Sequence, residues 1–338
     1  MNNIADFEKI RLVVNLLEET TTLRVVSEFL KNKQVHHSAG SWDIMLKQRI
    51  IPAIESKQIN FEDLVKLLSD SEESGKQHVF LYSLSAATAT ELLEPNRIES
   101  IVESLKLNEL PRLLDKPDEP TISDVRLSSS EHGKSELIVK IVSQKSHRKT
   151  LSDDTKGNIQ TIRFEHIPQR VVNLIKIYED GFVEVRLQSQ TGVSHNYQKE
   201  LKSFWGLVNA FVPYESLNMY SLTKVKDKFW NSRKELSELI RYTSYTLKND
   251  SGTCLRASAG GKDSSLMADV GANDSLDKFL NNDGFCDQSN IWFIEKEELL
   301  STDIHVLIEG ALNEFRLPKH CSKLDYDYVL SKIREFSI

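Results

Sequence analysis

The fold of this chain is decided by an alternating stretch near its middle, which reads Leu174-Ile175-Lys176-Ile177-Tyr178-Glu179-Asp180-Gly181-Phe182-Val183-Glu184-Val185-Arg186-Leu187. Asp180-Gly181 separates two runs of β-branched and aromatic residues, and glycine accepts the positive φ angle that a tight turn requires. The stretch therefore predicts a β-hairpin. Because side chains alternate across a strand, we expect the valines of the second run to face the core, and Glu184 and Arg186 to face water.

Further patterns of period two surround this hairpin. Leu137, Val139 and Ile141 predict a strand before it, and Ile162 with Phe164 indicates another. Strand-like runs follow at 242–247, 253–257, 291–295, 304–308 and 314–317, and helical patterns at 197–212, 221–240 and 326–336. This part of the chain predicts an α+β domain, with a largely antiparallel sheet and flanking helices.

The N-terminal part has a helical pattern instead. Apolar residues recur every three or four positions from Phe7 to Leu17 and again from Phe61 to Leu68. Asn60 suits an N-cap with Asp63 at the third helical position, and Pro52 should kink or end a helix. The apolar run 77–82 is interpreted as a buried helix end. We therefore expect an all-helical bundle at this end of the chain.

A change of composition separates the two parts. Pro111, Pro117 and Pro120 punctuate a polar run that ends in three serines at 128–130. Such a run is typical of a linker. The predicted organisation is a helical bundle at 1–110, serving as an interaction module, a linker at 111–131, and an α+β binding domain at 132–338.

Composition limits the class of protein. The chain has 338 residues, of which 39% are hydrophobic and 28% charged, and a net charge of −7. No apolar run approaches the ~20 residues of a membrane span, so we expect no contact with a membrane. The first residues lack the pattern of a secretory signal, and three widely spaced cysteines favour free thiols over disulfides. We therefore expect a cytoplasmic protein.

One short motif indicates nucleotide chemistry. The residues from Ala259 to Ser264 read Ala-Gly-Gly-Lys-Asp-Ser, and this string resembles the Ser-Gly-Gly-x-Asp-Ser signature of the PP-loop ATP-pyrophosphatase family. The resemblance implies that the motif binds ATP and Mg²⁺, and the nucleotide-binding residues would be Gly260, Gly261, Lys262, Asp263 and Ser264. Ala259 stands where the family has a serine, so one phosphate-binding hydroxyl is missing.

The position of this motif favours a different interpretation. Only 73 residues follow Ser265, whereas a parallel α/β domain needs crossover units of ~30 residues each. The segment 270–274 should also break the helix that a PP-loop requires. The alternative is a glycine-serine loop between a strand and a short helix, with no cofactor.

Two basic groups indicate nucleic-acid contact. The candidate residues are Lys140, Lys145, Arg148 and Lys149 in the first group, and Lys224, Lys228, Arg233 and Lys234 in the second. Such cations track a phosphate backbone, and Trp230 in the second group would add stacking on a base. The alternative is two solvated faces. No catalytic set or metal-ligand spacing accompanies them.

These observations predict a non-catalytic cytosolic binding protein, a subunit of a multi-protein complex. Its helical module would contact a partner protein, and its α+β domain would contact DNA or RNA. The pattern from Leu23 to Tyr82 resembles the small helical bundles of adaptors such as pyrin-like domains, and centromere protein N family members also place such a bundle before a β-rich domain. The alternatives are an ATP-using enzyme that acts through Gly260–Ser264 and a pure protein scaffold.

Overall fold

The computed structural model describes residues 4–107, 109–129, 135–190, 196–261, 263–296, 299–310 and 312–337. It divides into two compact units, here called unit 1 (residues 1–75 with 320–323) and unit 2 (residues 76–319 with 324–338). N-terminal helices precede a large antiparallel sheet with flanking helices, so the predicted α+β class is confirmed. No helix among the described residues is long and apolar enough to cross a membrane.

The boundary between the units differs from the expected one. The chain divides at Gly75 rather than near residue 110. Helices α6 (Ala86–Leu92) and α7 (Pro95–Ser104) belong to unit 2, where Leu92 and Ile98 join the core beside the sheet. The segment expected to be a linker contains strand β2 (Thr121–Ser129). Its prolines precede this strand within unit 2, and no proline marks the actual boundary.

Unit 1 is the helical bundle that the N-terminal pattern predicted. Its elements are α1 (Ile4–Thr20), α2 (Leu23–Asn32), α3 (Trp42–Met45), the π-helical turn η1 (Leu46–Ile50), α4 (Ile51–Glu55) and α5 (Phe61–Glu72). The expected cap of α5 is present as a reciprocal pair. The Asp63 backbone N–H donates to Asn60 Oδ1 at 2.7 Å, and the Asn60 N–H donates to Asp63 Oδ2 at 3.0 Å.

Pro52 does not end its helix. The chain stays helical from Trp42 to Glu55, and the π-helical turn lies immediately before α4, which contains Pro52. Proline lacks the N–H of the usual bond and its ring crowds the carbonyl four residues back, so a wider turn at this point accommodates it.

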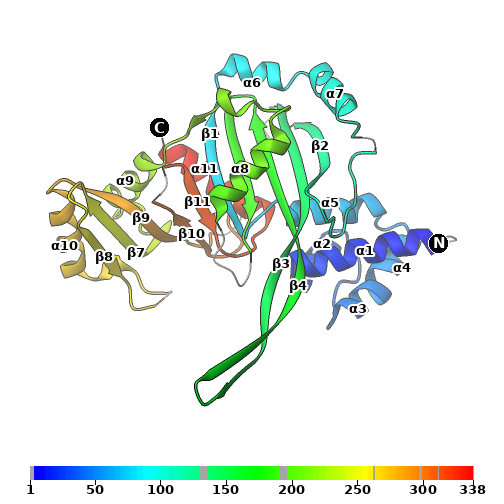
Figure 1. Ribbon diagram of the computed structural model, residues 1–338, viewed down its shortest axis with the longest axis horizontal. Coiled ribbons are helices and arrows are strands. Elements are labelled where there is room, and N and C mark those ends of the chain that lie inside the picture. Colours follow the sequence, from blue (N-terminus) through cyan, green and yellow to red (C-terminus); the bar gives the residue numbers. More distant parts are fainter. Residues whose placement is uncertain are drawn as a thin grey trace. The chain divides into compact units, whose positions relative to one another are not determined.

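Unit 2 is built on one sheet in the order β2-β3-β4-β5-β1-β11-β10-β9-β7-β8, with β6 paired beside β1 (Figure 1). All the pairings are antiparallel. Besides β2, the strands are β1 (Gln77–Ser83), β3 (Ser135–Lys156), β4 (Ile159–Tyr178), β5 (Phe182–Gln188), β6 (Asn218–Met219), β7 (Ile240–Asn249), β8 (Cys254–Ser258), β9 (Gly284–Phe293), β10 (Ile304–Ile308) and β11 (Glu314–Leu317).

Strand β1 overturns one expectation. Residues 77–82 were interpreted as a buried helix end, but they form a central strand between β5 and β11. Phe80 lies opposite Val185 on one side, and Val79 lies opposite Phe315 on the other. A strand that is buried on both faces is a continuous apolar run without alternation, so its sequence does not separate it from a buried helix.

The hairpin at Asp180-Gly181 is confirmed. It joins β4 to β5, and Gly181 has a φ of +83°. A side chain there would also collide with the backbone, since an added Cβ would lie 2.4 Å from the Leu84 carbonyl oxygen. Glycine is therefore required at this turn by both conformation and space.

Helices cover the sheet in two groups. α8 (Tyr197–Val208) packs with α6 and α7 on the strands from β2 to β1, through Leu201, Phe204 and Val208 (Figure 1). At the other end, α9 (Thr223–Asn231) and α11 (Lys323–Phe336) build an aromatic cluster. The Phe229 ring lies 5.4 Å from that of Phe336 and 6.2 Å from that of Phe293 in β9. The remaining helices are α10 (Val270–Leu280) and two short 3-10 turns, η2 (Tyr214–Ser216) and η3 (Leu266–Ala268).

Glu184 and Arg186 do not face water, contrary to expectation. The Glu184 side chain is fully buried, and its carboxylate accepts hydrogen bonds from Tyr178 Oη at 2.7 Å, Tyr326 Oη at 2.5 Å and Arg186 Nη2 at 2.5 Å. The Arg186 guanidinium lies 3.8 Å from the Tyr326 ring centroid. The predicted alternation of side chains between the two faces of β5 is correct. Alternation alone does not tell whether the second face is exposed to solvent or covered by other elements.

The charge of this buried group follows from its partners. Burial by itself would raise the pKa of Glu184, but the Arg186 guanidinium and the donated hydrogen bonds hold it below its usual value. Burial and the Glu184 charge both raise the pKa of Tyr178, whose hydroxyl stays a donor. Glu184 is therefore ionised in the folded protein.

Removing this carboxylate should destabilise unit 2. We expect Glu184→Ala to lower the free energy of unfolding by about 3–5 kcal/mol, because it leaves the Arg186 charge buried without its counter-ion. Urea unfolding followed by circular dichroism measures the change. Glu235→Ala, at an exposed position of the same unit, is the matched control and should change stability by no more than about 0.5 kcal/mol.

The difference in unfolding free energy between wild type and Glu184→Ala should also depend on pH. A carboxyl whose folded pKa is lowered stabilises fully above its unfolded pKa of about 4.3, and that contribution is lost as the pH falls through the folded value. The stability gap between wild type and Glu184→Ala should therefore narrow below pH 4. A gap that is constant or wider in acid would show that Glu184 is not held ionised.

Candidate nucleic-acid interface

Strands β3 and β4 continue to pair far beyond the rest of the sheet. Their ladder runs from Lys145 opposite Gln169 to Lys156 opposite Ile159. We call residues 145–169 the arm. At about 3.4 Å per residue the arm is about 40 Å long. Figure 1 shows it as a two-stranded ribbon, drawn in green, that leaves the sheet and carries no helix on either face.

The arm is twisted and ends in a tight turn. Its register shifts between Thr150 and Ser152, where one extra residue in β3 forms a bulge, and a bulge increases the local twist of a ribbon. At the tip Gly157 has a φ of +60°. An added Cβ at Gly157 would meet no atom within 4 Å, so there is open space on that side of the turn.

Large apolar side chains stand in solvent on this arm. Leu151 is 60% exposed and Ile159 is 70% exposed, and Ile162 and Phe164 are also exposed. Exposed apolar side chains gathered on one projecting element are typical of a contact surface, whereas single ones scattered over a protein need no explanation. The arm therefore has the surface character of a binding element.

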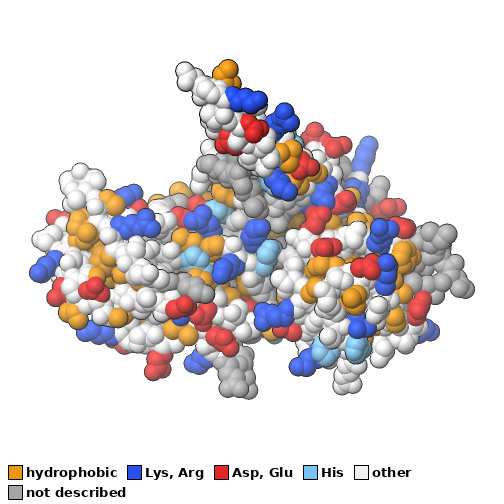
Figure 2. Space-filling view, turned by 90° about the horizontal axis from the view of Figure 1, so that it is seen from below, with side chains coloured by type: hydrophobic (Ala, Val, Ile, Leu, Met, Phe, Trp, Pro, Cys, Tyr) orange, Lys and Arg blue, Asp and Glu red, His pale blue; other side chains and the backbone are white. Residues whose placement is uncertain are grey.

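The cations of the arm are free to bind an anion. They are Lys145, Arg148, Lys149, Lys156 and Arg163, and none of the five is in an ion pair with another described residue. Arg148 lies over the Phe164 ring at 5.7 Å from its centroid. Figure 2 shows the arm standing clear of the neighbouring atoms, with hydrophobic, basic and acidic side chains along it.

The structure separates the residues of the first predicted basic group. Lys145, Arg148 and Lys149 lie on the arm, but Lys140 is in the covered part of β3 and is only 6% exposed. Arg170, just below the arm, is buried and donates from Nε to the Leu114 carbonyl oxygen at 2.9 Å. Only the three arm residues of this group are accessible to a ligand.

Sequence reasoning did not include Lys156 in the group and did not foresee the arm. A ribbon without a buried face has no need for apolar residues at every second position, so residues 143–161 show no strand period. The one available signal was the absence of acids from 137 to 152, which falls where the arm begins.

The second predicted basic group is only partly available. Lys224, Lys228 and Lys234 are exposed on α9 and the turn after it. Arg233 is paired, since its Nη2 donates to Asp277 Oδ2 at 2.6 Å. Trp230 is 2% exposed and its Nε1 donates to Asp277 Oδ1 at 2.8 Å, so it is a core residue that does not offer a face for base stacking.

The two basic groups do not form one surface. The arm belongs to β3 and β4, whereas α9 packs on β9, and strands β5, β1, β11 and β10 lie between them in the sheet. The predicted cations on the arm and those on α9 therefore do not form a continuous row that one ligand could follow.

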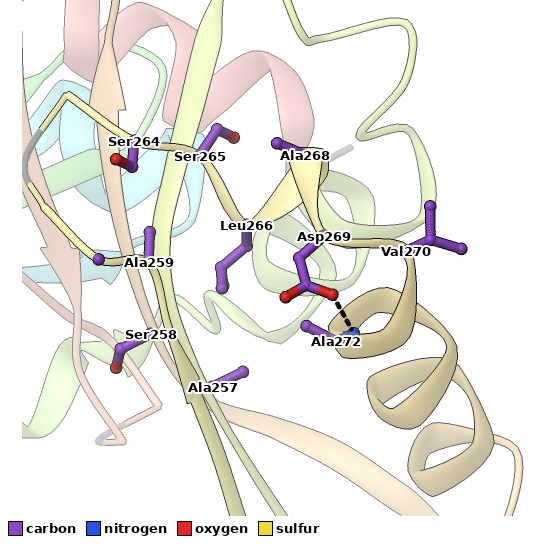
Figure 3. A pocket seen from close by; sticks show the side chains of 11 residues that line it. Ala257, Ser258, Ala259, Ser264, Ser265, Leu266, Ala268, Asp269, Val270 and Ala272 are labelled. Carbon is purple, nitrogen blue, oxygen red and sulfur yellow. Dashed lines mark hydrogen bonds between the residues drawn. The ribbon is translucent and has the colours of Figure 1, made fainter.

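The glycine motif lines a shallow pocket. Gly260 and Ser264 lie in its wall with Ala259, Ser265 and Asp269, and its volume is about 530 Å³ (Figure 3). Lys262 lies outside the described residues. A volume of this size is within the range of ligand pockets, but the described lining consists of small side chains, Leu266, Val270 and one carboxylate, with no cation.

The helix beside this pocket is not available to a phosphate. Residues 270–274 were expected to break a helix. They instead form the first turns of α10. Asp269 caps this helix, because its Oδ1 accepts from the Ala272 N–H at 2.9 Å (Figure 3). This carboxylate at the helix N-terminus accepts from the Ala272 N–H and repels the anion that a PP-loop would bind.

ATP should therefore not bind at this loop. We expect the melting temperature to stay unchanged when ATP and Mg²⁺ are added. A thermal shift in the wild type that Asp263→Ala abolishes, and that the exposed control Asp274→Ala retains, would contradict this and support the nucleotide interpretation.

Comparison with known proteins returns no relative from which a function can be transferred. No protein-family model matches the chain, and no curated protein is significantly similar to it. The function is therefore inferred from the geometry and charge of the residues described above.

Proposed function

We propose that this chain is a non-catalytic, cytosolic nucleic-acid-binding subunit of a multi-protein complex. The observation that carries the proposal is the arm, with unpaired cations along a ribbon that is exposed on both faces. A catalytic site is enclosed and holds its groups in fixed geometry. The arm is instead exposed on both faces, and such a ribbon suits an extended ligand that lies along it.

Electrostatics support this role in spite of the acidic total. The whole chain has a net charge of −7, but residues 145–169 contain five Lys and Arg against the three acids Asp153, Asp154 and Glu165. Local charge determines the contact, because interactions beyond about 8–10 Å are screened at physiological salt. Binding by such cations releases counter-ions from the nucleic acid.

Unit 1 is the module proposed to contact a partner protein. Among its described side chains no large apolar residue is exposed, so a partner would meet a polar surface. Salt bridges such as that between Lys47 Nζ and Asp43 Oδ1, at 2.7 Å, lie on that surface. No disulfide joins Cys254, Cys286 and Cys321, and this supports the proposed reducing compartment, because disulfides are rare there.

Neutralising the arm should weaken nucleic-acid binding. The triple variant Lys145→Ala, Arg148→Ala and Lys149→Ala removes three phosphate contacts. We expect the slope of log affinity against log salt to fall in magnitude by about 2 to 3, with a large loss of affinity at low salt. Fluorescence anisotropy with labelled DNA and RNA at several salt concentrations measures both quantities.

The α9 lysines provide the matched control. Lys224→Ala, Lys228→Ala and Lys234→Ala together change the net charge by the same amount on exposed residues away from the arm. Affinity and salt slope should stay close to wild type. Equal losses in the two triple variants would contradict a specific role for the arm, and the absence of binding by the wild type would remove the proposal itself.

A further inference from the structure

We propose that the arm enters the minor groove of duplex DNA and that the apolar side chains of its distal half act as a wedge that bends the duplex. This inference rests on the proposed function and adds the kind of nucleic acid and the mode of contact. It is carried by the shape of the arm, by the kind of residue at its tip and by the order of apolar and basic residues along it.

The dimensions of the arm match a duplex. Its length of about 40 Å is close to one helical turn of DNA, which is about 34 Å. A two-stranded ribbon of this length follows a groove, whereas a flexible single strand needs a broad stacking platform that the arm does not offer. The twist added by the bulge between Thr150 and Ser152 suits a ligand that is itself helical.

The tip has the residue types that minor-groove contact uses. Lys156, Asn158 and Ile159 are exposed around the turn at Gly157. Lysine and asparagine donors match the acceptors of A·T pairs in the minor groove, and an inserted aliphatic side chain unstacks a base step and kinks the duplex. Ile159 is 70% exposed and does not belong to the buried core.

The order of residues along the arm supports an inserted tip. Lys145, Arg148 and Lys149 lie on the half nearer the sheet, where they would face phosphates of the groove walls. Asp153 and Asp154 lie closer to the tip, and Asp153 Oδ1 accepts from Gln160 Nε2 at 2.8 Å. These acids disfavour contact with phosphates, and the minor groove is itself electronegative, so contact at the tip depends on Lys156, Asn158 and Ile159 at the turn beyond them.

The bend is measured by energy transfer between dyes at the two ends of a duplex of about 30 base pairs. We expect wild-type protein to increase the transfer on an A·T-rich duplex more than on a G·C-rich one. The double variant Leu151→Ser and Ile159→Ser should lose the increase while its salt slope stays unchanged and its affinity falls by no more than about tenfold. Val270→Ser, an equally exposed apolar residue on α10, is the control and should bend as wild type.

Four results would overturn the wedge. Duplex binding without a bend, or a bend that the double variant retains, would leave the proposed function standing and reject the insertion. A preference for single strands would do the same. If instead the protein forms a dimer that Ile159→Ser abolishes and binds no nucleic acid, the arm is a contact between two copies, and both the wedge and the proposed function fail.

Discussion

The pairing of β1 on both sides is the constraint on which unit 2 depends. Its seven residues hydrogen-bond to β5 along one edge and to β11 and β6 along the other. Without β1 the strands β2 to β5 and the strands β7 to β11 would be two separate sheets, each with an open edge beside it. One continuous sheet gives β3 and β4 a fixed base from which the arm extends.

Burial on both faces of this sheet explains its interior charges. The carboxylate of Glu184 is placed between two tyrosine hydroxyls and the Arg186 guanidinium, so that each of its two oxygens has at least one donor. Such a group stabilises only while it is complete. The buried Lys176–Glu136 pair on neighbouring strands, at 2.8 Å, follows the same rule. These charged residues on β3, β4 and β5 are therefore part of the core, whereas the cations of the arm on the outer part of β3 and β4 are exposed.

The sequence was sufficient for the fold class, the hairpin at Gly181 and the cap at Asn60, because each depends on local conformation or on a long periodic pattern. It was insufficient where the surrounding structure determines the secondary structure of a segment or the burial of a side chain. The apolar run of β1 is compatible with a helix or a strand, and the burial of Glu184 depends on a distant residue, Tyr326. For the candidate site, three of the first four predicted cations lie on an accessible element, and their binding role stays a prediction. Trp230 was assigned to the surface because its partner Asp277 is 47 residues away.

The arm is proposed to bind nucleic acid, and with no helix packed on it we expect it to contribute little to the stability of the fold. The most direct test of this proposal replaces residues 145–169 by Asn-Gly, because Gln144 and Arg170 lie opposite each other in the ladder and a two-residue turn joins such a pair. The account predicts that this variant keeps the wild-type circular dichroism spectrum and melting temperature, and loses nucleic-acid binding in fluorescence anisotropy. A folded variant that binds with wild-type affinity would contradict the account.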